Sequence, residues 1–235
     1  MPELLLGSET IRYSVRRSAR ARTIRLRITP HAGLEVVIPA DIDGLDIESL
    51  LRERAAWILK HQARLAPVTD SRQFQAGARL PFLGREYTLE ILAKTRGQRA
   101  SVSLHSDRLV VRPPAQSAPD AARAALEAWY RAEARRYLTA RAAELAQQHG
   151  FTYQRLTIKG QQTRWGSCSS RGNLNFNWRL MMAPPAAIDY VIIHELCHLR
   201  EMNHSRRFWA LVGRCCPDYR RWVKWFKLNG ARLHW

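Results

Sequence analysis

The clearest chemical pattern is formed by three histidines and a glutamate in the segment HELCHLREMNH, residues 194–204. His194 and His198 are four residues apart, so on a helix they share one face and their imidazoles can reach one metal ion. Glu195 would lie beside that ion, where a carboxylate can take a proton from an activated water molecule. The spacing therefore predicts a catalytic metal site, with zinc as the expected ion.

Two residues compete to be the third ligand, His204 and Glu201. On a straight helix Glu201 shares the face of the motif, but it lies about 10 Å along the axis from His194, too far for easy convergence. Asn203 is a residue type that can end a helix in a left-handed turn, and Ser205 is a good N-cap for a following helix. Such a turn would fold His204 back toward the metal, so we expect His204 to be the ligand.

The helix that carries the motif is expected to begin at Pro184-Pro185, because proline is tolerated in the first helical turn. Apolar residues follow on several sides of it, which predicts a helix that is buried nearly all round. Histidine and glutamate side chains in such a helix need polar partners. A metal ion would satisfy the histidines.

A second dense segment, TRWGSCSSRGNLNFNWRLMMAPP, precedes this helix at residues 163–185. We expect a tight turn at 165–168 and a hairpin tip at 169–172. Residues 173–180 alternate between polar and apolar types, which predicts a strand with one polar face. It is either an edge strand that pairs with a substrate backbone or an ordinary surface strand.

Several polar residues in and around this segment are candidates for contacts with a substrate. The candidates are Asn175, Asn177, Arg164, Arg179 and Tyr190. A stabiliser for a developing oxyanion is also expected near the metal. The candidates for that role are Tyr190, Arg164, Arg179 and Tyr219, and each is equally explained by packing or surface exposure.

Period-two alternation predicts strands in the first half of the chain, beginning with residues 10–15, 22–28 and 34–39. A helix is expected from about 47 to 65, where apolar residues recur at helical spacing. Further strands are expected at RLPFLG, REYTLEIL, SVSLH and RLVVRPP.

The second half is expected to be largely helical. An alanine-rich helix should follow a capping box at 117–120, run to His149 and stop at Gly150. The prediction is an α+β fold with a β-rich N-terminal portion, residues 1–117, and a largely helical metal-binding core, residues 118–235.

The chain carries 38 lysines and arginines against 20 aspartates and glutamates, a formal net charge of +18. With 46% hydrophobic residues it is not a disordered basic tail. The charge favours anionic partners: nucleic acid, nucleotides or acidic peptides. A merely solvated basic surface is the alternative.

No apolar run approaches the ~20 residues that cross a bilayer, and the N-terminal residues lack the charged segment of a signal peptide. We therefore expect a cytoplasmic protein. The four cysteines would then be reduced thiols. They form no paired CxxC pattern, so a structural four-cysteine zinc site is not expected.

Five segments together resemble the YgjP-like, SprT-related zinc metallopeptidases. The most specific are RWGSC at 164–168, HELCH at 194–198 and NHSRRFW at 203–209, with weaker likeness at Trp57-Ile58 and in RRSARARTIRLRI at 16–28. The resemblance covers about residues 11–230. It implies a zincin-like core and a zinc ion held by His194, His198 and His204, with Glu195 as the base in hydrolysis.

Zinc-dependent peptide hydrolysis is therefore the main hypothesis. Related proteases act on DNA-bound proteins, a setting that a charge of +18 would suit. A metal-dependent phosphohydrolase acting on nucleotides or another phosphoanhydride is the first alternative, because arginines would bind the phosphates. A nucleic-acid-binding module with a structural metal is the second. Glu195 argues against that last hypothesis, since a structural metal site has no use for it.

Overall fold

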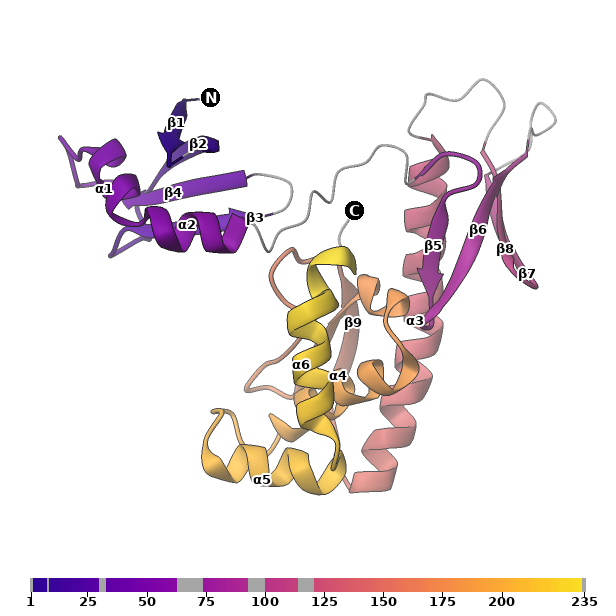
Figure 1. Ribbon diagram of the computed structural model, residues 1–235. Coiled ribbons are helices and arrows are strands. Elements are labelled where there is room, and N and C mark those ends of the chain that lie inside the picture. The colour runs from indigo at the N-terminus through magenta and orange to yellow at the C-terminus, as the bar shows by residue number, and fades with distance from the viewer. Residues whose placement is uncertain are drawn as a thin grey trace. The chain divides into compact units, whose positions relative to one another are not determined.

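The computed structural model describes residues 2–7, 9–29, 33–62, 74–92, 100–113 and 121–233. Helices and mixed sheets occur together, so the predicted α+β class is confirmed (Figure 1). The described residues form two units, one up to residue 62 and one from 74 to 233. Within these described residues, no helix is both long and apolar enough to cross a membrane.

The first unit is a four-stranded sheet packed against two helices. The strands are β1 (Glu3–Leu6), β2 (Glu9–Ser18), β3 (Arg25–Thr29) and β4 (Gly33–Pro39), in the order β1-β2-β4-β3. Alternate residues such as Ile11 and Tyr13 enter the core, as the period-two pattern predicts. The helices are α1 (Ile47–Glu53) and α2 (Ala55–Gln62), which contribute Leu51 and Ile58 to the same core.

The second unit begins with another four-stranded sheet. Its strands are β5 (Arg79–Phe82), β6 (Arg85–Ile91), β7 (Ser101–His105) and β8 (Arg108–Arg112), in the order β5-β6-β8-β7. The long helix α3 (Ala121–His149) contacts this sheet, and the hydroxyl of Tyr130 donates to the carbonyl of Pro81 at 2.6 Å.

The division between the units lies earlier in the chain than the predicted boundary at residue 117. Composition changes near 117, but contacts do not separate there, because β5–β8 pack on α3 and join the helical core. The predicted capping box at 117–120 lies outside the described residues. The predicted end of α3 is confirmed, since Gly150 follows His149 with a φ of +67°.

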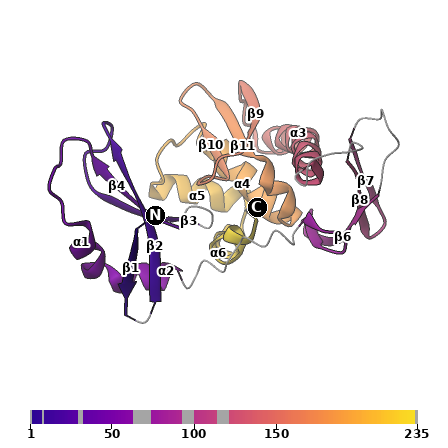
Figure 2. The same cartoon turned by 90° about the horizontal axis from the view of Figure 1, so that it is seen from above.

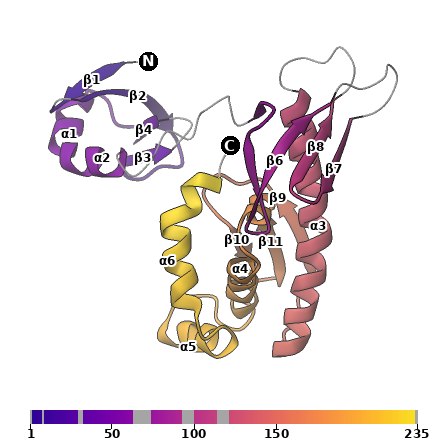
Figure 3. The same ribbon diagram turned by 45° about the vertical axis from the view of Figure 1, so that its right-hand side comes forward.

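A three-stranded sheet and three helices complete the second unit. The strands are β9 (Arg155–Lys159), β10 (Gly166–Cys168) and β11 (Asn173–Asn177), which Figure 2 shows side by side. The 3₁₀ helix η2 (Trp178–Met182) leads into α4 (Pro185–Cys197), which starts at the predicted prolines. The remaining elements are α5 (Arg206–Cys215), α6 (Tyr219–Asn229) and the 3₁₀ helix η3 (Gly230–Leu233). Helix α4 contacts α3, α5, α6 and β10, and Figure 3 shows it between α3 and α6.

Two predictions for the segment before α4 are wrong. The strand predicted at residues 173–180, with an edge strand as one of two alternatives, ends at Asn177 and is the central strand, because β11 pairs antiparallel with β10 and parallel with β9. Residues 166–168, predicted as a turn, form the edge strand β10 instead. The hairpin tip between them is confirmed, with the backbone N–H of Ser169 donating to the carbonyl of Asn173 at 3.0 Å.

Candidate metal centre and active site

Three histidine side chains converge at the end of α4. His194 lies in its last turn, His198 is its C-cap residue, and His204 follows in the segment before α5. The ring centroids are separated by 4.9, 5.0 and 4.7 Å. One nitrogen of each ring lies within 4.8 Å of the other two. Three nitrogens grouped in this way could hold one metal ion, and zinc–nitrogen bonds of about 2.0–2.1 Å would draw them somewhat closer together.

The chain reverses after α4, and this reversal brings His204 rather than the carboxylate of Glu201 into the cluster. The helix ends at Cys197, and the backbone N–H of Glu201 donates to the Cys197 carbonyl at 3.0 Å. Ser205 then caps α5, as predicted. The predicted left-handed turn at Asn203 is wrong, since this residue is not among the described residues with a positive φ. The chain instead leaves the helix through a turn at residues 198–200.

Hydrogen bonds orient two of the rings. Nδ1 of His198 lies 3.0 Å from the backbone carbonyl oxygen of Glu201. A carbonyl only accepts, so this nitrogen carries the proton and Nε2 keeps its lone pair. Nε2 of His204 lies 3.0 Å from Nε2 of His194. Nδ1 of His194 is buried without a hydrogen-bond partner among the described residues, and Nε2 is the nitrogen of this ring that faces His204.

Aromatic side chains of α5 surround the histidines. The ring of Phe208 stacks on His198 at 4.4 Å and meets His194 edge-on at 4.9 Å. Burial, and after it the neighbouring His198 and His204, lower the pKa of His194 to about 3. Burial also lowers the pKa of His198. The lowered pKa values favour the neutral forms of His194 and His198, and neutral imidazole is the form that binds a metal ion.

Glu195 is 5% exposed and lies beside the cluster, next to β10. Burial raises the pKa of its carboxyl group to about 8, and the charge of Arg164 partly opposes this rise. The close neighbour is Gly166, where an added Cβ would lie 2.6 Å from Oε1 of Glu195. The absence of a side chain at residue 166 therefore makes room for the carboxylate.

The replacement Gly166→Ala is expected to displace the Glu195 carboxylate and to lower catalytic efficiency by about 10²-fold. The added methyl group and the buried carboxylate cannot stay 2.6 Å apart, so either the backbone of residue 166 or the Glu195 side chain must move. The measurement is kcat/KM together with metal content, which should not change. Gly213→Ala is the matched control, because its Cβ would meet Tyr219 at an ordinary 3.5 Å. Equal activity of both variants would contradict this role of Gly166.

In metal-free protein, Glu195→Gln is expected to raise the free energy of unfolding at pH 8 by up to about 4 kcal/mol. This figure is the difference between the folded and the unfolded pKa of Glu195, converted at 1.36 kcal/mol per pH unit. The folded pKa lies above the unfolded value of about 4.5. The folded state therefore keeps a proton that the unfolded state releases, and stability falls as pH rises from 4.5 to 8. Denaturant unfolding in a chelator at several pH values measures the difference between variant and wild type. That difference should vanish toward pH 4, and Glu201→Gln should not reproduce it.

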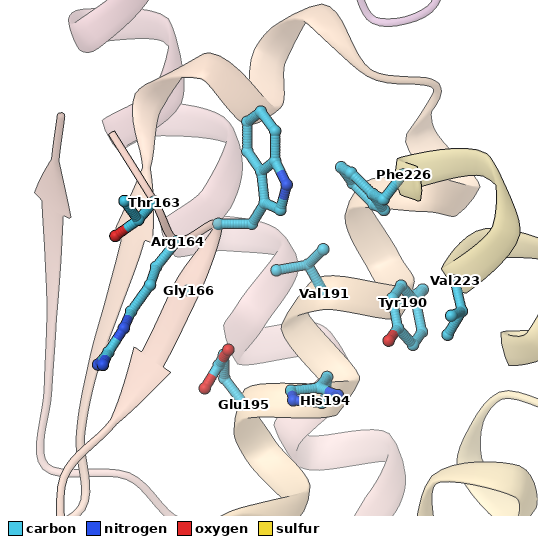
Figure 4. Close-up of a pocket in the computed structure, with 10 residues that line it drawn as sticks. Thr163, Arg164, Gly166, Tyr190, Val191, His194, Glu195, Val223 and Phe226 are labelled. Atoms are coloured by element: carbon cyan, nitrogen blue, oxygen red, sulfur yellow. The ribbon is translucent and has the colours of Figure 1, made fainter. Parts of the chain in front are cut away.

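Arg164 and Tyr190, two of the sequence candidates, line a pocket with His194 and Glu195 (Figure 4). Tyr190 precedes His194 by one helical turn, and the two rings lie 5.9 Å apart. The tyrosine hydroxyl lies on the side of its ring that faces His194. Burial raises the pKa of Tyr190 to about 12, with a further contribution from Glu195, so the hydroxyl keeps its proton at neutral pH.

The two asparagine candidates make contacts within the protein. The side-chain amide of Asn175 donates to the hydroxyl of Ser167 at 3.2 Å. Asn177 is buried, and its amide donates to the carbonyls of Gln161 and Arg164 at 2.6 and 3.1 Å. Asn177 thus holds the chain that leads into β10.

The other candidates lie away from this pocket lining. Arg179 is buried with its guanidinium 4.4 Å from the ring centroid of Trp178, and desolvation lowers its pKa. Tyr219 stacks on Trp209 at 5.4 Å. Cys168 is not part of the histidine group, and burial followed by the charge of Glu195 raises its pKa to about 11.

Sequence reasoning missed several residues of the site. Gly166 stood in a motif, but its close approach to Glu195 requires coordinates. Val191, Val223 and Phe226 line the pocket. The three-residue spacing of Val223 and Phe226 shows that they share one face of α6, but it does not show what that face meets.

The comparisons with known proteins agree with this geometry. The family model YgjP-like, metallopeptidase domain, matches residues 22–229. No curated protein and no solved structure matches the chain. The family implies a metal-dependent hydrolase, and the three histidines are a group able to hold its metal ion. As the sequence resemblance predicted, the chain belongs to the YgjP-like metallopeptidase family.

Proposed function

We propose that the protein is a zinc-dependent peptidase. The observation that carries this proposal is the convergence of three histidines beside Glu195, at the edge of a short sheet. His194, His198 and His204 would hold the ion through their Nε2 atoms. When bound, zinc polarises a carbonyl and lowers the pKa of water.

Glu195 is proposed to act as the general base. Its carboxylate is buried and held against Gly166, so it has few positions to occupy. The positive charges of Arg164 and of the ion favour its ionised form, which is the form that accepts a proton. Glu195 can then pass this proton to the leaving amine.

The substrate backbone is proposed to pair with the outer edge of β10. Residues Trp165 and Ser169 bond to β11 through their backbone groups. In an antiparallel ladder such pairs alternate, so the N–H and carbonyl groups of Gly166 and Cys168 point away from β11. No other strand of the described part of the chain pairs with β10. An extended peptide can add there as a further strand.

Tyr190 is proposed to stabilise the negative charge that develops on the carbonyl oxygen. Its hydroxyl is protonated, lies on the side of His194 and belongs to a rigid buried helix. A pre-positioned donor of this kind stabilises an oxyanion without reorganisation. Arg164 is the second candidate in the same pocket.

The protein substrate is proposed to lie in anionic surroundings, such as those of a DNA-bound protein. The last two helices and η3 carry eight exposed cations that have no carboxylate within 4.0 Å among the described residues. They are Arg206, Arg207, Arg214, Arg220, Arg221, Lys224, Lys227 and Arg232. On α3, by contrast, three of the arginines, Arg131, Arg136 and Arg141, are paired with carboxylates.

The pocket supports a peptide better than a phosphoanhydride. Phosphate groups are bound by several charge-assisted donors, whereas among the described residues Arg164 is the one cation that lines this pocket. The test is incubation of the zinc-loaded chain with casein and, in parallel, with nucleoside triphosphates. Cleavage of casein is expected. Nucleotide turnover without proteolysis would favour the phosphohydrolase, and DNA binding without either activity would favour a structural metal.

A further inference from the structure

A pocket of about 290 Å³ opens directly beside His194 and Glu195 (Figure 4). We infer that this pocket binds one large apolar side chain of the substrate, such as phenylalanine, leucine or methionine, next to the scissile peptide bond. The inference rests on the proposed peptidase function and names the substrate class that the site would select.

The walls of the pocket come from three elements and are mainly apolar. Val191 precedes Glu195 by one turn of α4, so both face the same space. Val223 and Phe226 face it from α6. Trp165, which directly precedes β10, completes the wall, and its ring centroid lies 5.3 Å from that of Phe226.

Packing from behind holds this wall in place. The ring of Tyr190 lies 6.4 Å from that of Phe226, so α4 and α6 meet through aromatic side chains. The buried Gly230 at the end of α6 lies against Trp165, where an added Cβ would be 3.4 Å from Cζ2. A preformed pocket of this kind binds a side chain without first reorganising.

The size of the pocket favours a single side chain. Pockets for whole drug-sized ligands measure about 300–1,000 Å³, and this one lies just below that range. The charged residues of its lining, Arg164 and Glu195, belong to the catalytic side. A charged side chain would lose its hydration against the apolar wall without a partner there. An apolar side chain gains free energy from the same transfer.

The geometry of β10 connects the pocket to the substrate. A peptide that pairs with this edge presents alternate side chains to opposite faces. Gly166 belongs to the strand edge and also lines the pocket with Glu195 and His194. The side chain that enters the pocket is therefore attached to a residue close to the reacting carbonyl.

The test compares Val223→Phe with wild type on a peptide library in which one position varies among Phe, Leu, Ala, Asp and Lys. Zinc-loaded wild type is expected to favour Phe and Leu over Ala, Asp and Lys by about 10–100-fold in kcat/KM. Val223→Phe fills the pocket, so this preference, measured as the ratio of kcat/KM between Phe and Ala peptides, should fall at least about tenfold. Leu228→Phe is the matched control, because Leu228 is 68% exposed on the same helix and is not among the pocket-lining residues.

A binding measurement separates this inference from the proposed function. The dissociation constants of N-acetyl-phenylalanine amide and N-acetyl-alanine amide are measured with Glu195→Gln and with Glu195→Gln/Val223→Phe, using tryptophan fluorescence. Tighter binding of the phenylalanine amide that the second replacement abolishes would support the pocket even if no peptide were hydrolysed. Cleavage without apolar preference, or a preference unchanged by Val223→Phe, would overturn the inference and leave the peptidase intact. Absence of both cleavage and selective binding would overturn both.

Discussion

Glu195→Gln is expected to lower kcat/KM for peptide hydrolysis by about 10²–10⁴-fold, the usual contribution of a general base. Glutamine has nearly the same shape, so it fits against Gly166, but its amide cannot accept the proton. The three histidines are unchanged, and the variant should still bind one metal ion per chain. Kinetics on a fluorogenic peptide and metal analysis of the same sample measure both quantities.

The control for this experiment is Glu201→Gln. Glu201 lies in the same short segment, but its backbone carbonyl, not its carboxylate, contacts the histidine cluster. Its replacement should leave kcat/KM within about threefold of wild type, as expected for a side chain that takes no part in proton transfer. A Glu195→Gln variant as active as wild type would contradict the role of Glu195 as the base, whatever its metal content.

His204→Ala is expected to weaken zinc binding by more than about 100-fold, since changes outside the ligand shell already cost about 10–100-fold. Two imidazoles would remain, fewer than the three protein ligands of catalytic zinc sites. His204 is the exposed member of the cluster, so its loss should disturb the fold less than loss of His194. Competition with a chromogenic chelator measures the affinity, and thermal unfolding of the metal-free variant checks the fold.

His149→Ala is the control for the histidine replacement, because His149 lies at the end of α3 and outside the cluster. Its zinc affinity should equal that of wild type. Unchanged zinc affinity in His204→Ala would contradict the proposed ligand set. In that case Glu201 would again be the residue to examine, since it follows His198 by three positions in the same reversal of the chain.

The regular elements were largely predictable because their patterns are local. Runs of apolar residues, mostly at alternate positions, predict β2, β3 and β4. The start of α4 is predicted by its prolines, and the start of α5 is predicted by its serine N-cap. The short strand β10 was not predictable, since three residues show no period and become a strand only by pairing with β11. The division between the units lies before β5 and not at residue 117, because the strands β5–β8 pack on a helix that follows them in sequence.

Some residues of the candidate site could likewise be predicted from the sequence, and others could not. The histidines and Glu195 could be located because a helix of 3.6 residues per turn determines which residues share a face. The pocket could not be predicted, because Trp165, Val191 and Phe226 are separated along the chain and meet only through tertiary packing. The same limit explains Asn177 and Arg179, whose polar groups suggest substrate contacts but are buried in the protein.

One titration tests most directly whether the histidine cluster and Glu195 form one catalytic centre. Zinc is added stepwise to the metal-free chain, and the rate of peptide hydrolysis is measured at each step. We expect no hydrolysis without metal, a rise in proportion to added zinc up to one ion per chain, and a plateau beyond it. In His204→Ala the rise should require a large excess of zinc, and in Glu195→Gln it should be absent. Hydrolysis by the metal-free chain at the wild-type rate would contradict the proposal.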